Sequence, residues 1–141
     1  MPGGDPRLRP RRRVILDASA LIAIVLDEPE REILVAKINA ADTIAVGAPT
    51  LVEAGIVLSA RAGQDVSAVL MELLASADAI VIEFGQRHWR EAVSAWGRFG
   101  KGRHPAGLNF GDCLTYATAL VAGEALLAKG DDFTQTDIPL A

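Results

Sequence analysis

Several features typical of exported or membrane-bound proteins are missing from this sequence of 141 residues. It has one cysteine, Cys113, so no disulfide can form within the chain, and a reducing setting is the simplest interpretation. It has no run of about eighteen apolar residues, so we expect no membrane span. The first apolar stretch contains Asp17, which does not fit a secretory signal peptide. We therefore expect a cytoplasmic protein in which Cys113 is a small buried residue.

Positive charge is scarce outside the first thirteen residues. Residues 1–13 contain five arginines and one aspartate, which gives this segment a charge of +4. Because the whole chain carries −4, residues 14–141 carry −8. Segment 1–13 is rich in proline, glycine and arginine and has little to bury, so we expect a disordered arm. Such an arm either contacts nucleic acid or a partner, or has no role of its own.

Half of the residues are hydrophobic, which is enough for the core of one domain over 14–141. Strand-like apolar runs alternate with helical patterns. The expected strands are 13–17, 43–49 with its exit turn, 79–84 and 124–128, with a short edge strand at 136–141. The expected helices are 18–28, 29–40, 50–62, 65–77, 86–99 and 108–120. This order predicts a single α/β domain with a mainly parallel sheet and helices on both faces.

Each of four acidic positions has an ordinary structural explanation. Asp17 follows a strand and precedes a helix, where aspartate is a common N-cap. Glu53 and Asp112 each follow a threonine or an asparagine by three positions, which is the spacing of a capping box. Asp131 and Asp132 lie in an expected turn, where aspartate is frequent. No single one of these acids indicates a functional site.

Taken together, the acids predict a metal site. Asp17, Glu53 and the Asp131/Asp132 pair follow expected strands, and the carboxyl ends of parallel strands meet at one edge of the sheet. Asp112 reaches the same edge if its helix begins there. Carboxylates gathered in one pocket repel one another and raise each other's pKa, so a cation is needed to neutralise them. Oxygen ligands alone favour Mg²⁺ or Mn²⁺ over zinc.

Four segments in order give the chain a family resemblance. They are "VILDASALIAIVLDEPE", "APTLVEAGIVLSAR", "GLNFGDCLTYATAL" and "LLAKGDDFTQTDI". Together they resemble the PIN-domain ribonucleases of the VapC toxin type, over residues 14–141. The resemblance implies a PIN-like three-layer α/β/α sandwich and an endoribonuclease that depends on Mg²⁺ or Mn²⁺. It also implies a cognate VapB-type antitoxin and a homodimer.

The resemblance also assigns the site. The acids of the family correspond to Asp17, Glu53 and Asp112, and its small hydroxyl residue corresponds to Ser19. Members with D-x-D-F in the last turn have an acid where this chain has a glycine. We prefer Asp132, which directly precedes a phenylalanine, over its neighbour as the fourth acid.

We expect different roles for the members of this site. Asp17 and Asp112 would be the most direct metal ligands, whereas Glu53 and Asp132 would act through water or hold a second ion. Ser19 would fix Asp17 or a phosphate oxygen.

RNA would be held outside the acidic pocket. The basic loop at 100–109 either contacts RNA phosphates or is a solvated, flexible loop without such a role. The candidates for phosphate contacts are Lys101, Arg103 and His104, with help from Arg87 and Arg90 in the helix before the loop. Trp89 and Trp96 are seven residues apart on one helical face, which favours packing over base stacking. We expect helices 18–28 and 50–62 to offer apolar surface to an antitoxin or to a second subunit.

Two alternatives differ in chemistry. The first is a metal-independent ribonuclease that uses His88 and His104 as acid and base, although these two histidines lie in different elements. The second is a module that binds metal and RNA without catalysis. A receiver-like or phosphatase pocket is disfavoured, because an aspartate nucleophile of that kind would need a second aspartate at the position of Ser19.

Overall fold

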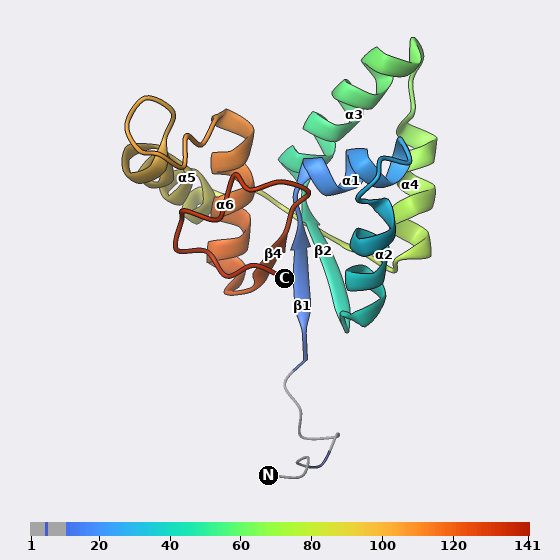
Figure 1. The fold of residues 1–141 in the computed structure, drawn as a ribbon, viewed down its shortest axis with the longest axis horizontal. Coiled ribbons are helices and arrows are strands. Elements are labelled where there is room, and N and C mark those ends of the chain that lie inside the picture. The colour runs from blue at the N-terminus through green and yellow to red at the C-terminus, as the bar shows by residue number, and fades with distance from the viewer. Residues whose placement is uncertain (1–4, 6–10) are drawn as a thin grey trace.

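The structure is a computed structural model that describes residue 5 and residues 11–141 (Figure 1). Most of the arm 1–13, for which disorder was expected, lies outside the described residues. Arg12 O accepts hydrogen bonds from Asp42 N (2.8 Å) and Thr43 N (3.0 Å). The chain therefore joins the domain at Arg12, one residue before the first strand.

Four short strands form the middle layer. They are β1 (Arg13–Leu16), β2 (Thr43–Gly47), β3 (Ile80–Ile82) and β4 (Ala125–Leu127), in the order β3-β2-β1-β4. All pairings between these strands are parallel, which confirms the predicted sheet. The edge strand expected at 136–141 is reduced to one isolated bridge between Leu126 and Leu140.

Helices cover both faces of the sheet, as expected for a three-layer α/β/α sandwich (Figure 1). One face carries α5 (Gln86–Phe99) and α6 (Phe110–Ala122), and the other carries α1 (Ala18–Val25), α2 (Arg31–Ala40), α3 (Ala48–Ala62) and α4 (Ser67–Ser76). Successive side chains of a strand point to opposite faces of the sheet, so one strand contributes to the hydrophobic core on each face. Ile15 packs in the cluster of α5 and α6, whereas Val14 and Leu16 pack in the cluster of α1 and α3.

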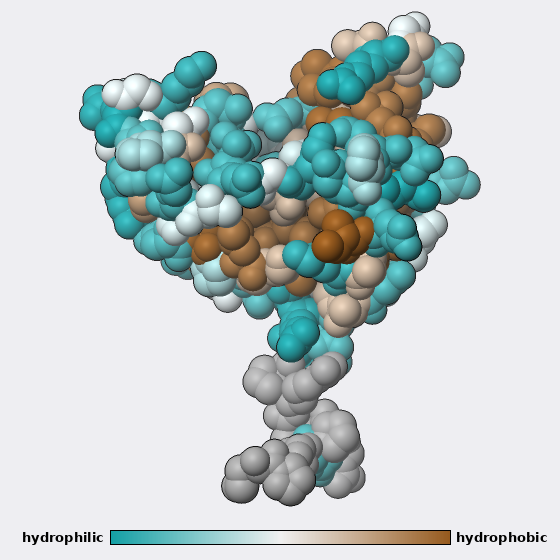
Figure 2. Space-filling view, viewed as in Figure 1, coloured by the Kyte–Doolittle hydropathy of each residue, from teal (hydrophilic) through white to brown (hydrophobic). Residues whose placement is uncertain are grey.

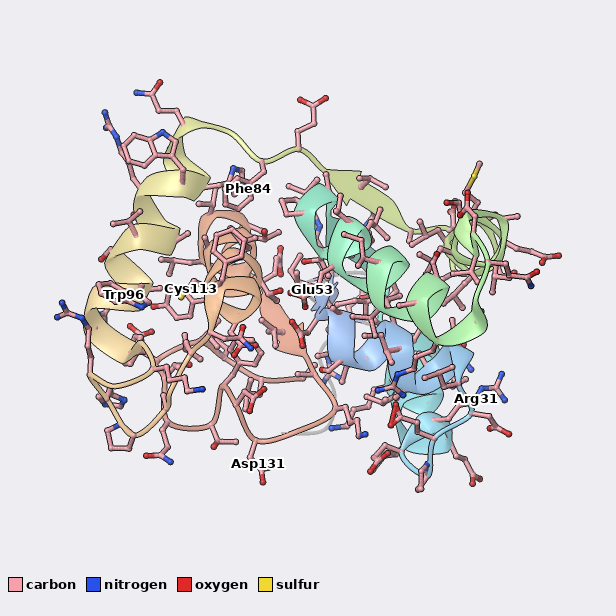
Figure 3. All side chains as sticks on the ribbon, turned by 90° about the horizontal axis from the view of Figure 1, so that it is seen from above. Arg31, Glu53, Phe84, Trp96, Cys113 and Asp131 are labelled. Carbon is pink, nitrogen blue, oxygen red and sulfur yellow. The ribbon has the colours of Figure 1, made fainter. Side chains whose placement is uncertain are left out.

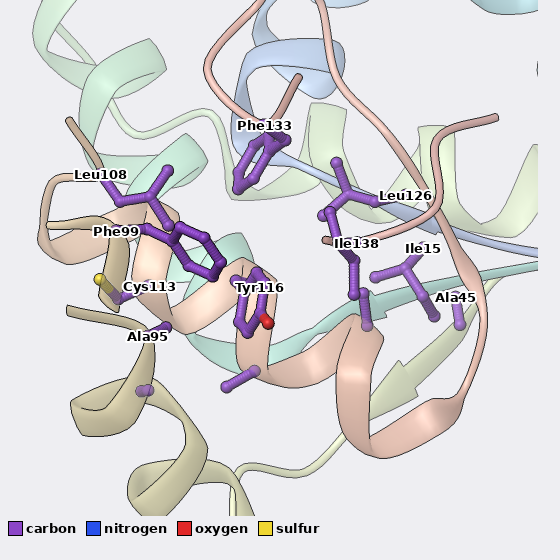
Figure 4. Packing of buried hydrophobic residues seen from close by; sticks show 13 residues of the cluster. Ile15, Ala45, Ala95, Phe99, Leu108, Cys113, Tyr116, Leu126, Phe133 and Ile138 are labelled. Carbon is purple, nitrogen blue, oxygen red and sulfur yellow. The ribbon is translucent and has the colours of Figure 1, made fainter. Parts of the chain in front are cut away.

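Tyr116 occupies the centre of the α5–α6 core, where it packs beside Phe99 (Figure 4). Its hydroxyl donates to Asp137, which also accepts a hydrogen bond from Arg98 Nη2 at 2.8 Å. Burial, and then the hydrogen bond to Asp137, raise the pKa of Tyr116 to about 12. This network attaches the C-terminal segment to both helices, and Cys113 is buried nearby as predicted.

Helix ends follow from local sequence. Gly63 and Gly123 end α3 and α6 in the left-handed conformation, with φ of 69° and 68°.

Within the described residues, no helix is long and apolar enough to cross a membrane.

Candidate active site

Asp17 lies where β1 ends and α1 begins, at the carboxyl edge of the sheet. It caps α1, because its Oδ2 accepts a hydrogen bond from Ser19 N at 3.1 Å. Its backbone N donates to Leu127 O at 2.9 Å, which holds it beside the end of β4. The residue is only 4% exposed, and Oδ1 is buried without a hydrogen-bond partner in the described part of the chain. The structural role of Asp17 therefore leaves one charged oxygen unsatisfied.

Glu53 reaches this edge from the second turn of α3. The helix begins at Ala48 with Gly47 as its N-cap, so the predicted capping box of Thr50 and Glu53 is wrong. Pro49 in the first turn starts the helix two positions earlier than we expected. The hydroxyl of Thr50 instead contacts that of Thr115, at 3.2 Å between the oxygens. Glu53 is thus free of a capping role.

The Glu53 carboxylate lies against the start of α6. Figure 3 shows its side chain between α3 and α6. A β-carbon on Gly111 would lie 2.7 Å from Glu53 Cδ and closer still to Oε2. Only glycine at this position leaves the carboxylate where it is. The sequence did not reveal this contact, because it joins residues far apart in the chain.

Asp112 lies in the first turn of α6, and here the predicted capping box is confirmed. Asp112 N donates to Asn109 Oδ1 (2.8 Å), and Asn109 N donates to Asp112 Oδ2 (3.1 Å). Asp112 is 8% exposed. The cap fixes the side chain at the same edge of the sheet as Asp17, since α6 begins there.

The turn after β4 brings the fourth acid. The charge of Asp132 raises the pKa of Asp112. The side chain of Asp131 points outward from the molecule in Figure 3, and its carbonyl accepts hydrogen bonds from the backbone and hydroxyl of Thr134. This geometry favours Asp132 as the acid that faces the site.

The electrostatics link all four carboxyls. Burial is the largest cause that raises the pKa of Asp112 to about 6; Asp132, Asp17 and Glu53 add to it, and the hydrogen bond from Asn109 opposes it. Burial, and then the charge of Asp17, raise the pKa of Glu53. The acids predicted from separate parts of the sequence are therefore near enough to one another to interact electrostatically. We call this cluster of Asp17, Glu53, Asp112 and Asp132 the acid pocket.

The pocket fits a divalent cation in charge and donor type. The buried Asp17 Oδ1 lacks a partner among the described residues, and a cation would satisfy it. No three carboxyl, imidazole or thiol groups of the described residues are close enough together to enclose a metal ion as they stand. Mg²⁺ does not require this, because it keeps several waters and takes only one or two carboxylates directly. Asp17 and Asp112, the two buried acids, suit that role.

Ser19 ties two parts of the pocket together. Its backbone N donates to Asp17, and its Oγ accepts a hydrogen bond from Lys129 N at 3.0 Å. Lys129 begins the turn that leads to Asp132, and its ammonium group pairs with Glu28. In this structure Ser19 fixes Asp17 and the turn relative to each other.

The expected RNA-binding residues lie outside the acid pocket, in the loop that leads into α6. Lys101 and Arg103 are exposed, and His104 is half-buried. His104 Nδ1 accepts a hydrogen bond from Ala106 N (3.0 Å), and its ring meets Phe99 edge-on. The loop lies on the same side of the molecule as the carboxyl ends of the strands (Figure 1). It therefore lies on the side of the molecule that carries the acids without being one of the elements that hold them.

Two expectations about surfaces need correction. Trp89 and Trp96 were expected to pack, yet they are 53% and 46% exposed. The apolar side chains of α1 were expected to face a partner, but most of them are buried in the core, because α3 covers that helix. The expectation holds for α3, where Val52 and Ile56 are exposed. Figure 2 shows hydrophobic residues gathered over this helix.

The chain resembles known proteins over nearly its whole length. Residues 14–139 match the family model of the PIN domain. Ribonuclease VapC36 of Mycobacterium tuberculosis is 41% identical over 126 residues, which covers 89% of this chain and 91% of that protein. Ribonuclease VapC28 of the same organism is 41% identical over 129 residues, or 91% and 97% of the two chains.

Solved structures with lower identity share the fold. The crystal structure of M. tuberculosis VapC20, described as a toxin that cleaves the sarcin–ricin loop, has a TM-score of 0.72 at 15% identity. It covers 91% of this chain and 98% of its own. VapBC2 from Rickettsia felis, bound to a DNA fragment from its promoter, has a TM-score of 0.72 at 13% identity. That alignment covers 92% of this chain and 97% of the other.

Proposed function

The chain belongs to the PIN-domain family of VapC ribonucleases, and we propose that it hydrolyses RNA internally as the toxin of a toxin–antitoxin pair. The observation that supports this proposal is the buried, unsatisfied oxygen of Asp17 in a group of acids whose charges raise the pKa of Asp112 and of Glu53. Without a cation, the burial of these acids and the repulsion between them would lower the stability of the fold. We infer that they hold Mg²⁺ or Mn²⁺ and that the backbone of RNA is the substrate.

The residues divide the chemistry among them. Asp17 and Asp112 would hold the cation, since they are the buried acids. When bound, the cation supplies charge neutralisation at the phosphate and lowers the pKa of water. Glu53, held against Gly111, would accept a hydrogen bond from the attacking water and orient it. Asp132 would act through water from the mouth of the pocket, and Ser19 would keep Asp17 in position.

No side chain serves as nucleophile in this mechanism. Water attacks phosphorus and the bond to the 3′-oxygen breaks, so the products would carry a 5′-phosphate and a 3′-hydroxyl. A metal-independent ribonuclease would instead leave 2′,3′-cyclic phosphates. The end groups of the products therefore distinguish the two mechanisms.

The structure disfavours His88 and His104 as an acid–base pair. His88 lies in the first turn of α5, where its Nδ1 accepts a hydrogen bond from Gly85 N at 2.9 Å. His104 lies beyond the other end of this 14-residue helix. At 1.5 Å per residue the helix separates them by roughly 15–20 Å, which is too far to act on one phosphate.

An antitoxin of the VapB type and a second copy of the chain are the partners that we propose. Exposed apolar side chains of α3 adjoin Glu53, in a hollow of about 780 Å³ that is also lined by Phe84 and Phe110. Phe110 is 79% exposed, although it lies two residues before Asp112. An antitoxin segment that covers this hollow would also cover the acid pocket, which would explain inhibition.

Cleavage of RNA by the isolated protein tests the proposed function. We expect cleavage with Mg²⁺ or Mn²⁺, none with EDTA, and 5′-phosphate ends. The Asp17→Asn variant should be inactive, and its folding should be checked by circular dichroism. Cleavage in EDTA would favour the histidine mechanism, whereas binding of metal and RNA without turnover would favour a non-catalytic module.

A further inference from the structure

One side of α5 carries a row of exposed apolar side chains. Trp89, Val93 and Trp96 are 53%, 62% and 46% exposed. Their spacing of four and three residues places them on one face of the helix. The adjacent face, with Ala92 and Phe99, packs on α6. The row is therefore an unpartnered surface within the described part of the chain.

The same region concentrates the positive charge of the domain. Residues 86–104 hold five of the nine lysines and arginines of residues 14–141, together with a single acid. Their charge is thus +4 within a domain that carries −8. Arg98 is paired with Asp137. No ion pair to a described residue is formed by the other four, which are Arg87, Arg90, Lys101 and Arg103.

The loop after α5 holds one of these cations over an indole ring. The guanidinium carbon of Arg103 lies 4.3 Å from the centre of the Trp96 ring. Arg103 N donates to Gly100 O at 2.9 Å, and Gly102 makes the tight turn with a φ of 82°. A β-carbon on Gly100 would lie 2.7 Å from Trp96 Cδ1, so glycine lets the loop lie against the ring. These contacts make the loop a hydrogen-bonded turn.

We infer that the face formed by Trp89, Trp96, Lys101 and Arg103 binds single-stranded RNA and leads it to the acid pocket. This inference rests on the proposed function and specifies its substrate class. Bases stack on aromatic rings and on guanidinium planes, while cations contact the phosphates. Cations that form no ion pair with a described residue, beside exposed indoles, suit a ligand that carries both phosphates and bases.

The position of the face agrees with this role. Lys101 N donates to Leu108 O at 3.0 Å, so the loop that carries Lys101 and Arg103 folds back beside the residue that precedes the N-cap of α6. Stacking on an indole requires a base that is not paired. The face therefore selects single strands or loops over duplex RNA.

Binding can be measured without cleavage. The probes are a fluorescein-labelled 12-nucleotide RNA of mixed sequence and the duplex of this RNA with its complement. Binding to the wild-type protein is measured in EDTA, and a gel shows that the RNA stays uncleaved. We expect tighter binding of the single strand. Trp96→Leu and Arg103→Gln should each weaken it by about tenfold or more. Arg61→Gln, an equal change of charge on the exposed end of α3, is the control and should have little effect.

Fluorescence provides a direct readout of stacking, because the chain has only two tryptophans. In Trp89→Leu, Trp96 is the only reporter, and bound RNA should quench it. In the active protein with Mg²⁺, Trp96→Leu should raise KM and leave kcat nearly unchanged. If the wild type cleaves RNA and Trp96→Leu has the same RNA affinity and the same KM, this face does not bind RNA. That result would leave the proposed nuclease function intact.

Two further results would overturn the inference. Equal affinity for single strand and duplex would remove the role of stacking. A change in sedimentation mass of Trp96→Leu, with unchanged RNA affinity, would show that this face contacts protein.

Discussion

Asp112 combines burial with three acidic neighbours, so its charge should lower the stability of the metal-free protein. The rise of its pKa from 3.8 to about 6 corresponds to about 3 kcal/mol, at 1.36 kcal/mol per unit. Water at the mouth of the pocket and the dipole of α6 reduce this cost. We therefore predict that Asp112→Asn raises the free energy of unfolding in EDTA at pH 7.5 by about 1–2 kcal/mol. Asparagine keeps an oxygen that can accept from Asn109, so the cap need not be lost.

The dependence on pH separates this effect from a general change in packing. Because the pKa of Asp112 is raised in the folded state, the folded protein binds the proton more tightly than the unfolded chain does. Protonation of Asp112 returns stability to the wild type as pH falls from about 6 toward 4, and Asp112→Asn lacks this contribution. The advantage of the variant at pH 7.5 should therefore shrink at pH 4.5.

Urea unfolding at both pH values, in EDTA, measures this difference. Asp131→Asn removes the same charge from an outward-pointing side chain, and it should change stability by no more than about 0.5 kcal/mol. An Asp112→Asn protein that is less stable than wild type at pH 7.5 would refute the argument. An advantage of equal size at both pH values would refute it as well.

Three other changes test the geometry of the pocket. Gly111→Ala should cut RNA cleavage by about 100-fold, because its methyl group displaces the Glu53 carboxylate, while Gly97→Ala, in open space on another helix, should not. Both substitutions should keep or slightly raise the melting temperature, since alanine favours helix by about 0.5–1 kcal/mol over glycine. A Gly111→Ala enzyme with wild-type activity would contradict the position assigned to the Glu53 carboxylate. Asp132→Asn should lower cleavage by roughly tenfold or more and Asp131→Asn should not, so equal or reversed losses would overturn this choice. Mg²⁺ at 100 times its Kd should stabilise the wild type by about 2.7 kcal/mol in thermal unfolding, and no shift would argue against a metal in the pocket.

Features set by neighbouring residues were predictable from the sequence. The capping box of Asn109 and Asp112 joins residues three apart, and its chemistry depends on little else. The strands were predictable for a similar reason, since apolar runs between helices indicate a buried parallel sheet. Once the sheet is parallel, the acids after β1 and β4 must lie at one edge. That is why Asp17 and the last turn could be placed together.

Features set by distant contacts were not predictable in the same way. The spacing of Thr50 and Glu53 indicates a capping box, but the helix begins earlier, at Ala48, directly after β2 and with Pro49 in its first turn. Periodicity shows that α1 has apolar residues, yet it does not show that α3 covers them. Likewise, the spacing of Trp89 and Trp96 does not show which side of α5 meets α6. Each of these depends on what packs against the element.

The glycine before Asp112 illustrates how such a contact relates stability to function. Alanine at Gly111 would favour the helix, and nothing in the local sequence explains why glycine is there. The structure gives a reason, because the missing β-carbon makes room for a carboxylate beside a buried acid whose pKa is already raised. Both features cost stability in the metal-free protein, and a bound cation would offset the cost of the carboxylates. A glycine that weakens a helix next to a costly carboxylate therefore points to a bound ion more strongly than either residue does alone.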